Sequence, residues 1–190
     1  MPQSERARDS RETPEAAWVE SLRGLQFFTR FSAAEMKSFA SHVEERELAK
    51  DDCLLRQGEP GGALYVLQAG SVHVRRYLPD GSHRRLAVLE AGAVIGEMEM
   101  LSGRPYYATV VAQEPGWALR LARPVFQANL EANAPWANKL LWHLSDTLAT
   151  RLEDTNARVV ETLDALDSSI NPSISELQRL RDHLANQWSF

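Results

Sequence analysis

The stretch GAVIGEMEMLSGRPYYAT, residues 92–109, decides the fold of this 190-residue chain. An apolar run ends at Gly96, where a residue without a Cβ atom lets the backbone enter conformations that other residues avoid. The apolar spacing over 98–101 predicts one turn of helix, which the following glycine and proline end. The sequence YYATVVA, residues 106–112, is predicted to return to strand. A bend, a helical turn and a strand would together form a small cradle.

The chemistry of this cradle suits a phosphate joined to a sugar. The start of the helical turn presents unpaired N–H groups, and these favour an anion because the donors and the helix dipole act together. We expect amides around 98–100 and 107–108 to face the phosphate. Glu97 can accept hydrogen bonds from a ribose hydroxyl.

The order G-E-(apolar)-x-(apolar)-(apolar)-x-G-x-P-x-x-A-T-V, read from Gly96, resembles the phosphate-binding cassette of cyclic-nucleotide-binding domains. That family includes the catabolite activator protein of bacteria and the regulatory subunits of cyclic-nucleotide-dependent kinases. Glycines 58, 70, 92 and 96 stand where the family has its glycines, which is more specific than any single motif. The resemblance implies a set of ligand-binding residues: Gly96, Glu97, Met98, Glu99, Arg104, Tyr106, Tyr107, Ala108 and Thr109.

The same resemblance implies an α+β fold. Its centre is an antiparallel β-barrel or jelly roll, also called a double-stranded β-helix, with N-terminal helices before it and a long C-terminal dimerisation helix after it. Short strands between turn signals over residues 47–120 independently predict a sandwich or barrel. Residues 79–82, PDGS, have the composition of a hairpin turn.

One position departs from the family pattern. An arginine that pairs with the cyclic phosphate normally stands where this chain has Tyr106, and the next position, here Tyr107, is usually small. Tyrosine cannot supply the planar fork of charged donors, so about 2–4 kcal/mol of binding, or about 30- to 1000-fold, would be lost. We therefore expect weak or absent binding of cyclic AMP or cyclic GMP, and no cofactor is certain.

Two alternatives follow from this departure. Arg104 could swing in as a substitute, whereas the arginines on neighbouring strands are expected to be solvated charges: Arg56, Arg75, Arg76, Arg84 and Arg85. In the second alternative both tyrosines fill the pocket, and the domain is a ligand-free scaffold for protein interactions. Glu97 would then hold the turn by accepting backbone N–H groups.

Composition and motifs narrow the function classes. The chain is 44% hydrophobic and 25% charged with a net charge of -5, which describes an ordinary globular protein and disfavours nonspecific nucleic-acid or anionic-membrane binding. The single cysteine, Cys53, cannot form a disulfide or a cysteine-ligated cluster within one chain. No signal peptide, membrane-spanning run, metal-ligand spacing or catalytic motif is present, so we expect a cytoplasmic protein that is neither an enzyme nor a metal protein.

The N-terminal part divides into a charged tail over residues 1–12 and a binding domain over 13–134. Thr13 is predicted to cap a first helix. Ser32 and Glu35 form a capping-box pattern, and apolar residues from Met36 to Val43 recur at helical spacing. A further helix is predicted near residues 125–131.

Residues 135–168 predict one long helix that begins at a proline. Its apolar stripe is longer than a small barrel can cover, which favours a parallel homodimer, and the family commonly dimerises in this way. The alternative is that the stripe packs entirely on its own barrel. The stripe consists of Leu141, Leu144, Leu148, Leu152, Val159, Leu163 and Leu166.

The last segment, residues 173–190, has the pattern of one amphipathic helix with a second capping box. A helix-turn-helix unit needs at least two helices, so direct DNA binding is not expected. The segment could pack on the long helix, cover the pocket or bind a partner protein. A protein partner that binds the C-terminal helices is our expectation.

Overall fold

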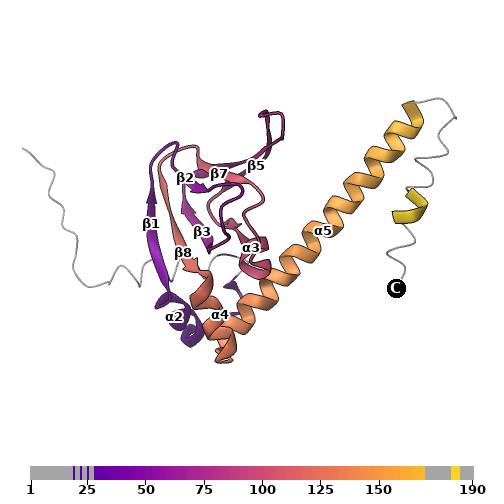
Figure 1. Ribbon diagram of the computed structural model, residues 1–190. Helices are drawn as coiled ribbons and strands as arrows, with labels where there is room; N and C mark the ends of the chain where they lie inside the picture. The colour runs from indigo at the N-terminus through magenta and orange to yellow at the C-terminus, as the bar shows by residue number, and fades with distance from the viewer. Residues whose placement is uncertain (1–18, 20–21, 23–24, 26–27, 170–180, 185–190) are drawn as a thin grey trace, which may run out of the picture. The chain divides into compact units, whose positions relative to one another are not determined.

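The structure is a computed structural model (Figure 1), and it describes residues 19, 22, 25, 28–169 and 181–184. The chain divides into two compact units, 1–144 and 145–190. The predicted tail, the helix capped by Thr13 and most of the predicted helix over 173–190 lie outside the described residues.

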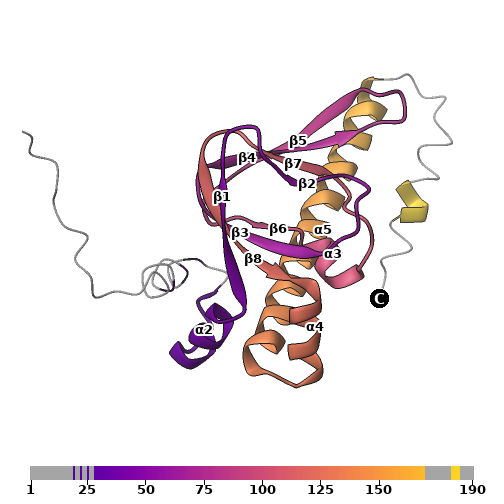
Figure 2. The same cartoon turned by 60° about the vertical axis from the view of Figure 1, so that its left-hand side comes forward.

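Within the described residues, the first unit contains two antiparallel sheets of four strands each. The first sheet has the order β1-β8-β3-β6 and the second has the order β2-β7-β4-β5. The strands are β1 (Val43–Leu48), β2 (Cys53–Leu55), β3 (Ala63–Ala69), β4 (Ser71–Tyr77), β5 (His83–Glu90), β6 (Val94–Ile95), β7 (Thr109–Ala112) and β8 (Gly116–Ala122). The predicted antiparallel barrel of the jelly-roll type is confirmed (Figures 1 and 2).

The two faces of the first sheet carry different cores because side chains alternate along a strand. Its inner face meets the second sheet through Leu48, Tyr65, Leu67 and Ala118, which are buried in one cluster with Val72 of β4. The helices cover its outer face. They are α2 (Ala33–Ala40), α4 (Arg123–Glu131) and the first turns of α5 (Pro135–Ser169).

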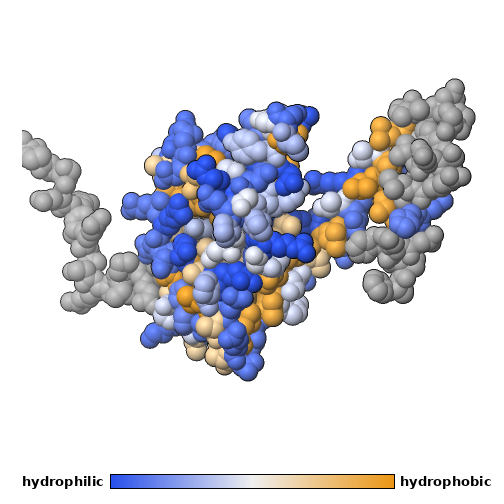
Figure 3. All heavy atoms as spheres, in the orientation of Figure 1, coloured by the Kyte–Doolittle hydropathy of each residue, from blue (hydrophilic) through white to orange (hydrophobic). Residues whose placement is uncertain are grey.

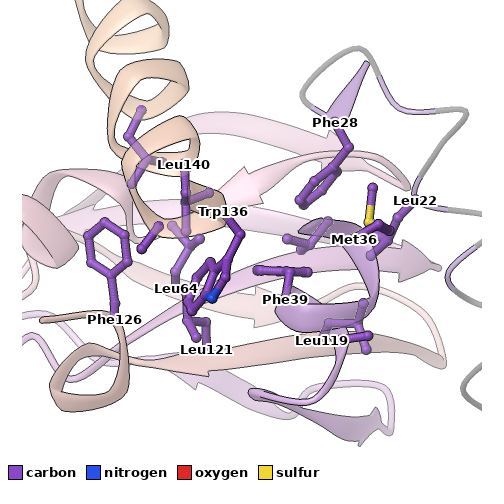
Figure 4. Packing of buried hydrophobic residues seen from close by; sticks show 14 of the residues in the cluster. Leu22, Phe28, Met36, Phe39, Leu64, Leu119, Leu121, Phe126, Trp136 and Leu140 are labelled. Carbon is purple, nitrogen blue, oxygen red and sulfur yellow. The ribbon is translucent and has the colours of Figure 1, made fainter. Parts of the chain in front are cut away.

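Figure 4 shows the core between these helices and the sheet, where Phe39, Phe126 and Trp136 surround the strand residues Leu64 and Leu121. Trp136 is 1% exposed, and its ring meets Phe39 edge-on with the centroids 5.7 Å apart. Aromatic rings from three helices thus pack together against the strand residues of this core.

The predicted capping box at the start of α2 is confirmed. Glu35 N–H donates to the Ser32 hydroxyl at 3.3 Å, and Ser32 N–H donates to the Glu35 carboxylate at 2.7 Å. The same carboxylate accepts from Lys139 of α5 at 2.6 Å, and this hydrogen bond, followed by the one from Ser32, lowers the pKa of Glu35 to about 2. The predicted helical continuation to Val43 is wrong, because α2 ends at Ala40 and Val43 begins β1, paired with Leu121.

The connection between β4 and β5 is a hairpin, as the PDGS sequence predicts. Asp80 accepts from Ser82 N–H at 2.9 Å, and Leu78 N–H donates to the Ser82 carbonyl at 2.8 Å. His73 and His83 do not face each other across this hairpin, because His73 pairs with Val88 and His83 pairs with Tyr77.

Helices α4 and α5 agree with the sequence prediction, and α5 is 35 residues long. Leu144, which the sequence assigns to the dimer stripe, is 0% exposed in the core of the first unit. In the second unit Leu152 is 46% exposed and Val159 is 42% exposed. Hydrophobic side chains accordingly gather on the surface of this part of α5 (Figure 3).

Candidate functional site

The predicted cradle begins with the bend at Gly96. This glycine has φ +86° and forms the N-cap of α3 (Glu97–Ser102), which includes the predicted turn and extends it by one residue at each end. A Cβ atom here would lie 2.7 Å from the Ala63 carbonyl oxygen, so both the backbone angle and the close approach require glycine. Gly103 ends the helix by donating its N–H to the Glu99 carbonyl at 2.8 Å.

The chain does not return to strand at Tyr106 as predicted, because β7 begins at Thr109. The Tyr106 backbone bonds a loop instead. Its N–H donates to the Glu59 carbonyl, and its carbonyl accepts from Gly58 N–H, both at 2.9 Å. The side chain turns into the core between the sheets, where only 8% of Tyr106 stays exposed. Burial of this ring and the loop pairing displace the strand by three residues relative to the predicted start at residue 106.

The Tyr106 hydroxyl bonds three backbone groups at the start of β3. It accepts the N–H groups of Gly62 and Ala63, each at 3.0 Å, and it donates to the Ala63 carbonyl at 3.2 Å. A phenol offers one donor and accepts through its lone pairs, so this hydroxyl is fully used. The ring is therefore buried between the sheets and is held at its hydroxyl by the backbone of residues 62 and 63.

Glu99 accepts a hydrogen bond from a backbone amide that we predicted to face the phosphate. Glu99 is 6% exposed, and its Oε1 accepts the N–H of Tyr107 at 2.8 Å. The N–H of Met100, also predicted to face the phosphate, donates to the Gly96 carbonyl at 2.9 Å inside the helix. A carboxylate of the chain thus supplies a negative oxygen at the cradle.

Tyr107 lies at the surface of the cradle and is 49% exposed. Nη1 of Arg76 on β4 donates to the Tyr107 carbonyl at 2.7 Å, and its guanidinium carbon lies 3.8 Å from the ring centroid. Arg76 is therefore not the solvated charge that we expected, whereas Arg84 and Arg85 are exposed. The sequence gives no signal for this contact, because it depends on the register of β4 against β7.

The remaining predicted site residues are divided between the interior and the surface. Glu97 is 5% exposed and has a bonding partner, whereas Met98 is 45% exposed. Arg104 is exposed, and its N–H donates to the Ser102 hydroxyl. Ala108 is half-buried. The buried Thr109 hydroxyl accepts Gln57 N–H at 3.0 Å, at the edge of a hollow of about 280 Å³.

Two further properties bear on the class of site. Across the part of the chain that the structure describes, His, Cys, Asp and Glu side chains form no group of three or more that could hold a metal ion. In the same residues, no helix combines the length and the apolar character that crossing a bilayer requires.

The family model of the cyclic nucleotide-binding domain matches residues 45–133, which run from within β1 to just beyond α4. Two curated relatives match about half of the chain. The acetyltransferase Pat of Mycolicibacterium smegmatis is 34% identical over 98 residues, 50% of this chain and 29% of its own length. A cAMP-dependent protein kinase regulatory subunit of Mycosarcoma maydis is 30% identical over 97 residues, 51% of this chain and 18% of its own length. The chain thus spans less than a third of either relative.

A solved structure matches over more of its length. The crystal structure of a cyclic nucleotide-binding domain from Methylobacillus flagellatus is 31% identical to this chain. The match covers 76% of this chain and 81% of that one, with a TM-score of 0.66. Together with the glycine-bent cradle and the jelly-roll topology, this similarity shows that the chain belongs to the cyclic nucleotide-binding domain family.

Proposed function

We propose that this chain is a regulatory binding module whose cyclic-nucleotide cradle is closed by its own side chains. Cyclic AMP and cyclic GMP then bind weakly or not at all, and the module acts on a partner protein without being an enzyme itself. The observation that carries this proposal is the bonding of the buried Tyr106 hydroxyl to Gly62 and Ala63.

Electrostatics support the proposal. By its place in the cassette pattern, Tyr106 takes the position of the arginine that pairs with phosphate in the family. Among the described residues, the guanidinium of Arg76 donates to the Tyr107 carbonyl and that of Arg123 donates to the Met100 carbonyl, so both are already bonded to backbone carbonyls of the cassette. A phosphate would also have to displace the Glu99 carboxylate from the Tyr107 N–H, and two anions at one amide repel each other.

The stripe on α5, of which Leu141, Leu152, Val159 and Leu166 are exposed, supports action as a homodimer. Leu141, Leu152 and Leu163 are spaced by eleven residues, as are Leu148 and Val159. An eleven-residue repeat corresponds to about 3.67 residues per turn, so two such helices would pair with a right-handed supercoil. The core position of Leu144 limits the proposed contact to the remainder of the stripe.

The two curated relatives support a regulatory role through a partner, because in each of them the matched stretch is a minor part of a longer protein. One of these is an acetyltransferase and the other is a kinase regulatory subunit.

The second candidate function is a scaffold that binds no ligand, and the buried, hydrogen-bonded Tyr106 side chain supports it as well. The two differ in whether a cyclic nucleotide at any concentration changes the thermal stability of the chain.

Titration calorimetry with cyclic AMP and cyclic GMP tests the proposal. We expect no measurable heat for the wild type and restored binding in Tyr106→Arg, because the guanidinium returns a bidentate phosphate contact and frees the amides of Gly62 and Ala63. Tyr77→Arg, which adds the same charge at an exposed position of β4, is the matched control and should not bind. Micromolar binding by the wild type would overturn the proposal.

A further inference from the structure

A cleft borders the Tyr106 ring and is lined by residues of both sheets. Its volume is about 300 Å³, and it is lined by residues of β1, β2, β3 and β8 together with Tyr106: Arg46, Cys53, Leu55, Tyr65 and Arg120. Tyr106, Gly62 and Ala63 also belong to this lining, whereas Glu97, Met98, Glu99 and Tyr107 of the cassette do not. The cleft therefore adjoins the contacts of the Tyr106 hydroxyl but does not include the cassette amides that we predicted for the phosphate.

Two arginines enter this cleft from the inner face of the first sheet, which also carries the core residues of the barrel and, on β1, Glu44. Arg120 pairs with Tyr65 in the strand register, and Arg46 pairs with Ala118. Alternation along these strands places both guanidinium side chains on the inner face, beside the core residues Tyr65 and Ala118. Burying a charge among core residues costs free energy unless an opposite charge accompanies it. We therefore expect each of these arginines to have an anionic partner.

The charges of the cleft are not balanced by the chain. Arg120 pairs with Glu44 at 3.0 Å, and Arg56 pairs with Glu59 at 3.2 Å. Arg46 has only neutral partners among the described residues: it donates to the Tyr65 hydroxyl and to the Cys53 carbonyl, each at 3.1 Å. One half-buried positive charge is therefore left over.

We propose that this cleft binds a small organic acid whose carboxylate lies between Arg46 and Arg120. A planar carboxylate matches the fork of a guanidinium, and the Tyr65 hydroxyl supplies a third polar group. Leu55 and Ala63 give the rest of the ligand an apolar wall. The volume corresponds to about ten water molecules, which sets an upper size of about ten non-hydrogen atoms.

Glu44 tunes the affinity in this account. Its side chain is 73% exposed while that of Arg120 is 32% exposed, so Glu44 reaches the arginine from the solvent side. Removing the Glu44 carboxylate releases Arg120 for the ligand. The neighbouring Glu45 provides a matched control, because it is exposed on the opposite face of β1 and carries the same charge.

Cys53 reports on the cleft because it lines the cleft and is the one cysteine of the full sequence. The experiment measures the rate at which N-ethylmaleimide alkylates Cys53 in the full chain as sodium benzoate or sodium acetate is added at constant ionic strength. Sodium chloride is the reference salt, and inorganic phosphate forms a separate arm. We expect saturable protection by benzoate, whose ring fits the apolar wall, and weaker protection by acetate.

The variants give effects of opposite sign. Glu44→Gln should tighten benzoate binding about two- to fivefold, and Glu45→Gln should leave it unchanged. Arg46→Gln should weaken it about tenfold or more, and Arg84→Gln should have no effect. If Arg46→Gln fails to fold, the comparison of Glu44→Gln with Glu45→Gln still tests whether the ligand binds beside Arg120.

Three results would overturn the proposal. One is an alkylation rate that no carboxylate changes. Another is an equal effect of Glu44→Gln and Glu45→Gln, which would indicate a general effect of charge. The third is protection by inorganic phosphate without protection by either carboxylate, which would remove the assignment to an organic acid.

Discussion

The Tyr106 hydroxyl occupies both polar groups of the Ala63 backbone, accepting its N–H at 3.0 Å and donating to its carbonyl at 3.2 Å. The two residues are 43 positions apart, and their contact joins the cassette to the first residue of β3. The Tyr106 side chain therefore stabilises the fold at the position where the family's cassette pattern has the arginine that pairs with phosphate.

Tyr106→Phe should lower the free energy of unfolding by about 1–3 kcal/mol, because the buried N–H of Ala63 would lose its acceptor. Urea unfolding measures this change. Tyr77→Phe removes the same hydroxyl from an exposed ring and should cost much less. Equal losses in both variants would contradict a structural role of the Tyr106 hydroxyl.

Glu99→Ala should destabilise the protein by about 1.5–3 kcal/mol in the absence of any ligand, because a charge-assisted bond to the Tyr107 N–H is lost. The matched control is Glu114→Ala, an exposed glutamate in the turn between β7 and β8. Differential scanning calorimetry at pH 7 compares the two. A wild-type melting temperature in Glu99→Ala would show that this carboxylate does not hold the cassette.

Much of the barrel could be predicted from the sequence because it depends on local signals. Gly96 needs a positive φ, PDGS makes a hairpin turn, and Ser32 with Glu35 caps a helix; each of these is confirmed. The prediction of strand at Tyr106 failed because alternation in YYATVVA does not show that a ring will turn into the core.

The contacts of the candidate site were less accessible to sequence reasoning. The replacement of an arginine by Tyr106 was visible in the cassette pattern, but its bonds to Gly62 and Ala63 require the fold. The contact of Arg76 with Tyr107 arises from strands that are distant in sequence. The contacts of Tyr106 and the contact of Arg76 both depend on how segments that are distant in sequence pair in the fold, and no local sequence pattern fixes that pairing.

His73 predicts a pH dependence of stability. Burial, with added repulsion from Arg75 and Arg85, lowers the pKa of His73 below its ordinary value of 6.5, while Asp51 acts in the opposite direction. Its Nε2 is also buried without a hydrogen-bond partner among the described residues. The folded state therefore prefers the neutral ring.

The sign follows from proton linkage. Below pH 6.5 the unfolded chain binds a proton at His73 that the folded chain resists, so this contribution is complete above pH 6.5 and is lost as the pH falls through the lowered pKa. Urea unfolding between pH 7.5 and 5 should show this decline, and His73→Gln should reduce its slope. An unchanged slope in His73→Gln would contradict the assignment.

The stripe on α5 predicts a dimer that a single charge disrupts. Leu152→Glu should shift sedimentation equilibrium toward the monomer, because Leu152 is exposed on the stripe and would bring like charges together across a parallel pair. Thr150→Glu adds the same charge on another side of the helix and should leave the dimer intact. If the two variants sediment alike, pairing through this stripe is wrong.

The central claim is that the donors of the cradle are already bonded within the chain. The most direct test is a ¹H–¹⁵N NMR titration of the wild-type protein with cyclic AMP, which follows the amide signals of Gly62, Ala63 and Tyr107. We predict that these three signals stay in place at millimolar nucleotide and that they shift saturably in Tyr106→Arg. Saturable shifts of all three in the wild type would contradict the claim.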